Sequence, residues 1–214
     1  IKGGHAVTTV LGDQLSEPAV ARLLGETLPS EATLYVAASM PIRDVEEFFP
    51  VRDEPPRVIA NRGANGIDGT VSAAFGAAAV SEGPVVLLIG DVALAHDIGG
   101  LLAASRSKLD LTIVLLNNDG GGIFDFLAIN RQPDVVREHV STSHGLDFSH
   151  AAALYGIEHA AVTAQTQLTA AVARGIGNSG SKIIEVHTER ATNRALHAAV
   201  ESAALDAIAT GPGA

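Results

Sequence analysis

One acidic and two amide side chains stand where two apolar segments of this chain end. Asp91 comes just after the apolar residues 85–89, and Asn117-Asn118 follow the apolar residues 111–116. Short apolar runs that end in polar residues or glycine are typical of buried parallel strands, and ligands bind beyond the carboxyl ends of such strands. Oxygen donors held there suit Mg²⁺, which takes few protein ligands and completes its shell with phosphate and water. The two segments therefore predict a magnesium site beside a phosphate-bearing ligand.

Glycine-rich segments accompany these side chains. Residues 120–122 are all glycine, so the backbone there could approach a phosphate closely. Residues 63–69 contain three glycines and lead into a predicted helix. Their spacing does not fit the dinucleotide-binding fingerprint, and alone this segment could equally be a turn. Asp91 alone would be typical of a helix N-cap, but the amide pair after the next strand favours metal binding.

The two blocks together resemble the cofactor motif of thiamine-diphosphate enzymes, in which Gly-Asp is followed at a distance by Asn-Asn. Most of those enzymes have glycine after the aspartate, where this chain has Val92. Residues 61–69 and 117–124 are more similar to one branch, the C-terminal part of the 2-succinyl-5-enolpyruvyl-6-hydroxy-3-cyclohexene-1-carboxylate synthases, which usually lack that glycine. The resemblance runs from about Ser39 to the last predicted helix.

The resemblance implies a metal and a cofactor. Mg²⁺, with Mn²⁺ as an alternative, would be bound by side-chain oxygens of Asp91 and Asn118 and by the carbonyl of Gly120. Ile67 would prop thiamine diphosphate into its bent shape, although a core isoleucine is the alternative. Asn117 is left open between ligation and shaping the turn. The cofactor-binding residues implied are Ser39, Gly66, Ile67, Gly90, Asp91, Asn118, Gly120, Gly121 and Ile123.

It also implies an activity: decarboxylation of 2-oxoglutarate and addition of the succinyl unit to isochorismate in menaquinone biosynthesis. Arg43 and Arg62, each expected at the end of a strand, would bind substrate carboxylates, which the planar guanidinium matches; a surface arginine without a role is the alternative. Ile123, Phe124 and Leu127 would line the substrate pocket and exclude water, whereas ordinary core packing is the other interpretation.

Alternating helix and strand signals predict an α/β fold in three layers, with a six-stranded, mainly parallel sheet and helices on both faces. This agrees with the thiamine-diphosphate-binding fold that the resemblance implies. Strands are expected at residues 33–38, 58–60, 85–89, 111–116, 158–162 and 182–187. Helices are expected at 18–28, 71–80, 93–105, 148–155, 166–176 and 192–208, with Ser16 and Asp147 as N-caps. Residues 120–145 are expected to form an irregular functional loop with a short helix.

The chain is interpreted as a fragment. Residues 1–30 would be a linker and first helix from the end of a central domain, 31–210 the diphosphate- and Mg²⁺-binding domain, and 211–214 a disordered tail. The resemblance places the activating glutamate on an N-terminal domain of a neighbouring subunit, so we expect no catalytic residue in this fragment and no activity from it alone. A homodimer or homotetramer is expected.

Composition excludes several classes of protein. The 214 residues carry a net charge of −10, which argues against nucleic acid as a partner. The absence of cysteine excludes disulfides and thiol catalysis, and the eight histidines show no metal-ligand spacing. No apolar stretch is long enough to span a membrane and no secretory signal is visible, so a cytoplasmic protein is expected.

Two rival interpretations remain open. One is the diphosphate-binding subunit of another thiamine-diphosphate-dependent 2-oxo-acid decarboxylase, although such subunits usually carry glycine where this chain has Val92. The other is a non-catalytic oligomerisation domain, against which the intact pair of Asp91 and Asn118 argues.

Overall fold

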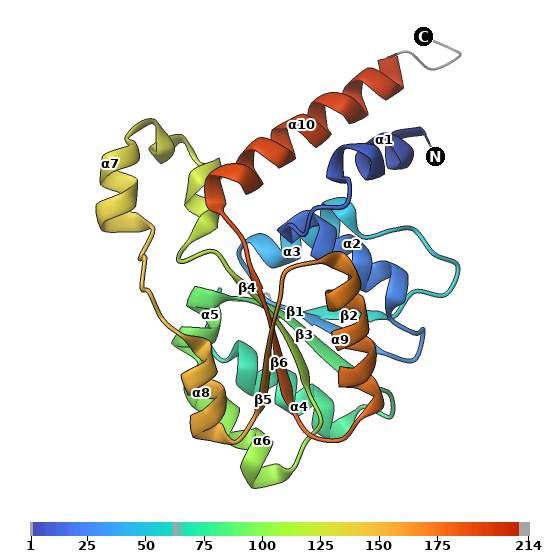
Figure 1. The fold of residues 1–214 in the computed structure, drawn as a ribbon, viewed down its shortest axis with the longest axis vertical. Coiled ribbons are helices and arrows are strands. Elements are labelled where there is room, and N and C mark those ends of the chain that lie inside the picture. Colours follow the sequence, from blue (N-terminus) through green and yellow to red (C-terminus); the bar gives the residue numbers. More distant parts are fainter. Residues whose placement is uncertain (1, 62–63, 65, 210–214) are drawn as a thin grey trace.

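The computed structural model describes residues 2–61, 64 and 66–209. Its centre is a six-stranded sheet in the order β2-β1-β3-β4-β6-β5, and every described pair of neighbours is parallel. Figure 1 shows helices packed around this sheet. The predicted α/β fold is therefore confirmed. The strands are β1 (Thr33–Val36), β2 (Arg57–Ala60), β3 (Val85–Gly90), β4 (Thr112–Asn117), β5 (Glu158–Val162) and β6 (Lys182–His187).

The strand order reverses direction between β1 and β3. From β1 the chain adds β2 on one side, and from β3 it adds β4 on the other. Such a reversal leaves a crevice at the carboxyl ends of the two central strands, where ligands of open α/β sheets bind. Val36 pairs with Leu88, and Gly90 pairs with Leu116. The segments that follow β1, β3 and β4 consequently emerge at the same edge of the sheet.

Alternate residues of the strands pack into two cores, one on each face. Leu34, Leu88 and Val114 face one core with α2 (Glu17–Thr27), α3 (Met40–Phe48) and α9 (Gln165–Gly177). Tyr35, Leu87 and Ile113 face the other core. The helices on that face are α4 (Thr70–Val80), α5 (Asp91–His96), α6 (Leu102–Ser107) and α8 (Phe148–Tyr155). Because both faces are covered, the central strands β1, β3 and β4 are buried on both sides, and this explains their apolar runs.

The predicted helix at 93–105 is broken in two, because the 3₁₀ turn η1 (Ile98–Leu101) separates α5 from α6. Asp97 ends α5, and its carboxylate accepts a hydrogen bond from the backbone N–H of Ser72 at 2.8 Å. A Cβ on Gly100 would lie 2.7 Å from Oγ of Ser72, so α4 approaches the backbone here too closely for a regular helix with side chains.

Two helices were not expected. In α3, Met40, Val45 and Phe48 are buried while Arg43 is exposed, so an amphipathic helix lies where a strand end was expected. Arg43 is therefore on a helix, which corrects its predicted position. The other unexpected helix, α1 (Lys2–Leu11), packs along the long α10 (Arg190–Ala209).

Residues 120–145 are irregular, as predicted. They form the 3₁₀ turns η2 (Gly122–Phe126) and η3 (Ala128–Arg131), the short α7 (Pro133–Val135) and the π-helical turn η4 (Val136–Val140). This segment extends away from the sheet beside the start of α10 (Figure 1). Among the described residues, no helix has both the length and the apolar character needed to cross a membrane.

Both predicted N-caps are confirmed. Oγ of Ser16 accepts a hydrogen bond from the N–H of Ala19 at 3.3 Å, and the carboxylate of Asp147 accepts one from Ser149 at 2.9 Å. The boundary drawn at residue 30 stays a prediction, although α2, which precedes it, packs into the core of the sheet. The predicted tail at 211–214 lies outside the described residues.

Candidate metal and cofactor site

Asp91 joins the segments that follow β3 and β4. Its side chain is 2% exposed. Oδ1 accepts a hydrogen bond from the N–H of Val92 at 2.7 Å. Oδ2 accepts two more across the sheet edge, from Asn118 at 3.1 Å and from Gly120 at 2.9 Å. The structure thus brings together the three residues for which the sequence predicted metal ligation.

Asn118 presents an amide oxygen that has no partner in the described part of the chain. Its Nδ2 donates to Oε1 of Glu17 at 2.8 Å, but its Oδ1 is buried and accepts no hydrogen bond from any described group. A buried acceptor without a donor is costly, and a bound cation would satisfy it. An amide oxygen beside a carboxylate is a donor set that suits Mg²⁺, so the residues present fit the predicted metal.

The loop after Asn118 requires glycine. Gly120 has φ +138°, and a Cβ there would lie 2.2 Å from the carbonyl oxygen of Ser141. The N–H of Gly121 donates to this same oxygen at 2.7 Å, which holds the loop against residue 141. A Cβ on Gly122 would lie 2.9 Å from Nδ2 of Asn118 and would displace that amide. The three glycines therefore allow a tight loop next to the candidate ligands.

A cavity of about 300 Å³ opens at this edge of the sheet. A second, larger space of about 1120 Å³ lies between residues 125–146 and the start of α10. Only the first is lined by Asp91, so we place the candidate site there. The predicted residues that line it are Ser39, Ile67, Gly90, Asp91, Asn118, Gly120, Gly121, Ile123 and Phe124.

Four predicted site residues are not among those that line this cavity. Gly66 lies close to it, because a Cβ there would be 3.9 Å from the Cβ of Ala38, which lines the cavity. Leu127 is 51% exposed, and Arg43 is exposed. Arg62 lies outside the described residues.

Ser39 has an unusual backbone. Its φ of 77° lies in the region that favours glycine, and such conformations at non-glycine residues cluster at ligand sites. Its carbonyl oxygen accepts a hydrogen bond from Nη1 of Arg43 at 2.6 Å, so the first turn of α3 holds this residue in place.

Two residues beside the site were missed from the sequence. Glu17 is 1% exposed, and burial raises the pKa of its carboxyl. Nε2 of His144 lies 3.2 Å from Oδ2 of Asp91. Glu17 is separated from its partner Asn118 by 101 positions, and His144 lies in the irregular segment without any metal-ligand spacing, so no local pattern marks either residue.

A buried acid–histidine pair lies on α3 and α10. Asp44 is 0% exposed, and one of its oxygens is 3.0 Å from Nε2 of His197. Burial raises the pKa of Asp44 to about 7. Burial alone would lower the pKa of His197, but the Asp44 carboxylate, together with Glu47 and Glu17, more than offsets this and raises it. The rings of Phe48 and Phe126 stand edge-on to the imidazole, each with a centroid separation of 5.0 Å, so this histidine joins α3, α10 and η2.

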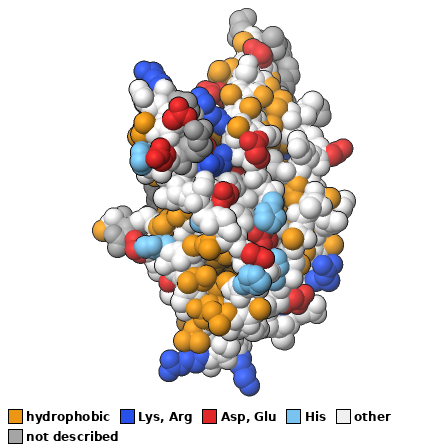
Figure 2. All heavy atoms as spheres, turned by 60° about the vertical axis from the view of Figure 1, so that its left-hand side comes forward, with side chains coloured by type: hydrophobic (Ala, Val, Ile, Leu, Met, Phe, Trp, Pro, Cys, Tyr) orange, Lys and Arg blue, Asp and Glu red, His pale blue; other side chains and the backbone are white. Residues whose placement is uncertain are grey.

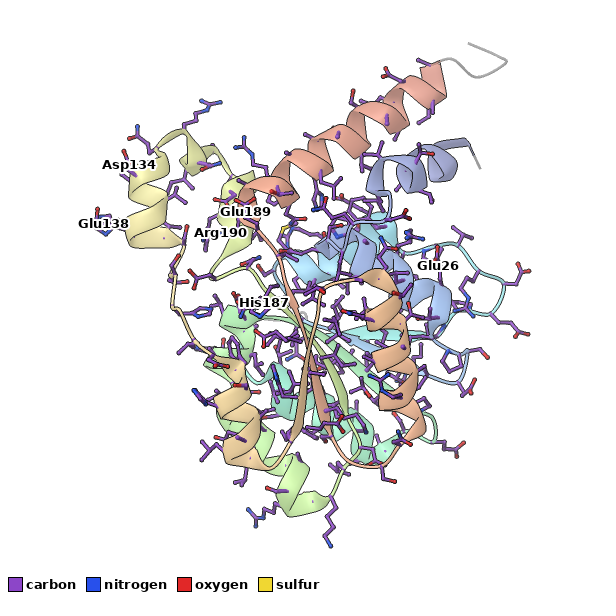
Figure 3. All side chains as sticks on the ribbon, in the orientation of Figure 1. Glu26, Asp134, Glu138, His187, Glu189 and Arg190 are labelled. Atoms are coloured by element: carbon purple, nitrogen blue, oxygen red, sulfur yellow. The ribbon has the colours of Figure 1, made fainter. Side chains whose placement is uncertain are left out.

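The larger space has a mixed lining. Figure 3 shows His187, Glu189 and Arg190 where β6 runs into α10, facing the irregular segment. Nε of Arg190 lies 3.9 Å from an oxygen of Asp125. Acidic and basic groups thus alternate around this space, which does not favour a ligand of either charge.

Comparison with known proteins identifies the family. Residues 42–186 match the family model described as thiamine pyrophosphate enzyme, C-terminal TPP binding domain. The chain belongs to this family. Thiamine pyrophosphate is thiamine diphosphate under another name, so the resemblance seen in the motifs is confirmed.

Two curated relatives of this TPP-binding domain are named 2-succinyl-5-enolpyruvyl-6-hydroxy-3-cyclohexene-1-carboxylate synthase. The one from Myxococcus xanthus is 48% identical over 183 residues, which cover 85% of this chain and 31% of the relative. The one from Listeria welshimeri is 44% identical over 197 residues, which cover 92% of this chain and 33% of the relative. The chain therefore spans about a third of the length of these relatives.

A solved structure agrees with the fold. An enzyme from Mycobacterium smegmatis, assigned as thiamin diphosphate-dependent, superposes with a TM-score of 0.66 at 26% identity. The match covers 82% of this chain and 32% of that one.

Proposed function

We propose that this chain is the cofactor-anchoring third of an enzyme that decarboxylates 2-oxoglutarate and adds the succinyl unit to isochorismate in menaquinone biosynthesis. The observation that carries the proposal is the meeting of Asp91, the glycine loop and the oxygen of Asn118 at one cavity, where no described group donates to that oxygen. The names of the relatives support the choice of reaction. In such an enzyme the bound thiamine diphosphate supplies a carbon centre that stabilises a carbanion.

The metal would be held by this chain. We assign Mg²⁺ to side-chain oxygens of Asp91 and Asn118 and to the carbonyl of Gly120, with Mn²⁺ as a substitute. Hard oxygen donors from two adjacent strands support this assignment, since phosphate and water would complete the shell. The backbone donors to Oδ2 of Asp91 would keep that carboxylate fixed while its other oxygen binds.

The remaining residues would orient ligands and exclude water. Ile67 is half-buried at the cavity and would support the cofactor from one side. Ile123 and Phe124 also line the cavity, and Leu127 follows on the same segment; apolar side chains there would keep water from the reacting atoms. Arg43 and Arg62 would bind substrate carboxylates. Arg43 is exposed on α3 and is therefore accessible.

The active protein would be an assembly. The activating glutamate would come from the protein's own N-terminal domain in a neighbouring subunit, within a cytoplasmic homodimer or homotetramer. Exposed apolar side chains favour association: Leu102 is 51% exposed and Leu154 is 77% exposed. Figure 2 shows apolar side chains gathered in the lower part of the face that carries α8.

A chimera tests the reaction. This chain would replace the matching third of the Myxococcus xanthus relative, and CO₂ release from 2-oxoglutarate would be measured with and without isochorismate. We expect release that depends on isochorismate, lost by at least about 100-fold in Asp91→Ala because the metal loses its charged ligand. Asp147→Ala is the matched control, since Asp147 also stands at a helix start but away from the cavity.

The chimera also separates the rival functions. Release of CO₂ from other 2-oxo acids but not from 2-oxoglutarate would support the rival interpretation, in which the chain belongs to another 2-oxo-acid decarboxylase. A chimera that binds thiamine diphosphate but releases nothing from any 2-oxo acid would contradict a catalytic role.

A further inference from the structure

We infer that Glu17 is a positioning residue that decides which atom of Asn118 faces the metal. This inference rests on the proposed function, because it concerns the same magnesium site. Nδ2 of Asn118 donates to Oε1 of Glu17 at 2.8 Å, and Glu17 is 1% exposed. Glu17 also lines the candidate cavity, although it comes from α2, far from the motif in sequence.

An asparagine needs such a partner because the two ends of its amide have nearly the same shape and opposite roles. The nitrogen only donates and the oxygen only accepts, so a rotation of 180° would turn a metal ligand into a group that repels the cation. The carboxylate of Glu17 accepts from the nitrogen and thereby excludes the rotated state. The oxygen of Asn118 is left buried, and no group that the structure describes donates to it, which suits a ligand for a cation.

Glu17 is itself held on two sides. The hydroxyl of Thr188, just after β6, donates to the same Oε1 at 2.7 Å. On its own helix, Glu17 follows the N-cap Ser16 and precedes Pro18, which fixes the first turn. Two donors on one oxygen from separate elements leave the glutamate little freedom to turn, so the orientation it imposes on Asn118 is rigid.

The preceding residue offers an internal comparison. Nδ2 of Asn117 also donates to a buried glutamate, Glu185, at 2.7 Å. Its Oδ1, however, accepts a hydrogen bond from the N–H of Asp119 at 3.2 Å. Both amides are oriented by a glutamate, but only that of Asn118 keeps its oxygen available. Asn117 thus shapes the turn, and Glu185 provides a matched control for Glu17.

A double-mutant cycle with metal affinity as the readout tests this role. Mg²⁺ would be titrated calorimetrically into the chain with saturating thiamine diphosphate, for the wild type, Glu17→Gln, Asn118→Asp and the double variant. Glutamine can offer either end of its own amide, so we expect Glu17→Gln to weaken Mg²⁺ binding by about tenfold or more. Glu185→Gln should change it by less than about threefold, since Asn117 is not a ligand.

The Asn118→Asp background distinguishes orientation from packing. Both oxygens of an aspartate can bind the metal, so neither rotation is harmful there. In that background Glu17→Gln also replaces one of two facing carboxylates by an amide that can donate, so we expect no loss of Mg²⁺ affinity or a gain, which makes the two substitutions strongly coupled. Equal losses in both backgrounds, or no loss from Glu17→Gln alone, would overturn the inference. If neither the wild-type chain nor the chimera bound thiamine diphosphate in a magnesium-dependent way, the proposed function would be overturned instead.

Discussion

Oδ2 of Asp91 accepts a hydrogen bond from the N–H of Gly120 at 2.9 Å, so one buried carboxylate holds the loop after β4 against the end of β3. We expect Asp91→Ala to destabilise the chain by about 1–3 kcal/mol, because three backbone N–H groups lose their acceptor. Urea unfolding at pH 7 checks this. A variant as stable as the wild type would show that the loop is held by other contacts.

Gly120 should be the least replaceable residue of the loop. A Cβ there would meet the carbonyl oxygen of Ser141 at 2.2 Å, on a backbone with φ +138°. We expect Gly120→Ala to lower the free energy of unfolding by more than about 2 kcal/mol. Gly76→Ala is the control, because Gly76 is exposed in the middle of α4 with open space around it and should gain about 0.5–1 kcal/mol. Similar results for the two variants would contradict the assigned loop conformation.

The pair of Asp44 and His197 predicts that stability falls as pH rises. Burial holds the pKa of Asp44 at about 7 in the folded chain, above its unfolded value of 3.8, so the folded state binds a proton that the unfolded state releases between these values. The raised pKa of His197 acts in the same direction: its contribution is complete below pH 6.5 and is lost above its folded pKa. For each proton, the free energy of unfolding falls by at most about 1.4 kcal/mol per pH unit.

Urea midpoints between pH 5.5 and 7.5 measure this slope. Asp44→Asn should flatten it, because it removes one titrating group and the carboxylate that raises the pKa of His197. Asp53→Asn changes the net charge equally at an exposed position and should leave the slope unchanged. Stability that rises with pH in this window would refute the assignment.

The sequence predicted those features that depend on neighbours along the chain. The central strands β3 and β4 are short apolar runs followed by polar residues or glycine, and such a run shows where a strand ends and hence which side chains share the sheet edge. Asp91 and Asn118 were found in this way. Ser16 and Asp147 were found from capping chemistry, which is equally local.

Features set by distant contacts were not predictable. Glu17 looks like any acidic residue in a first helical turn, and only the fold brings it to Asn118. The break after α5 depends on Ser72, because its backbone N–H binds Asp97 and its side chain crowds Gly100. The position of Arg43 was mistaken because α3 starts close after β1, with only three residues between Val36 and Met40.

The most direct test of the central claim is a calorimetric titration of thiamine diphosphate into this chain and into the chimera, with and without Mg²⁺. The proposed site predicts binding that requires Mg²⁺, is lost in Asp91→Ala and persists in Asp147→Ala. Binding by neither protein, or binding that Asp91→Ala leaves unchanged, would contradict a metal and cofactor site at the ends of β3 and β4.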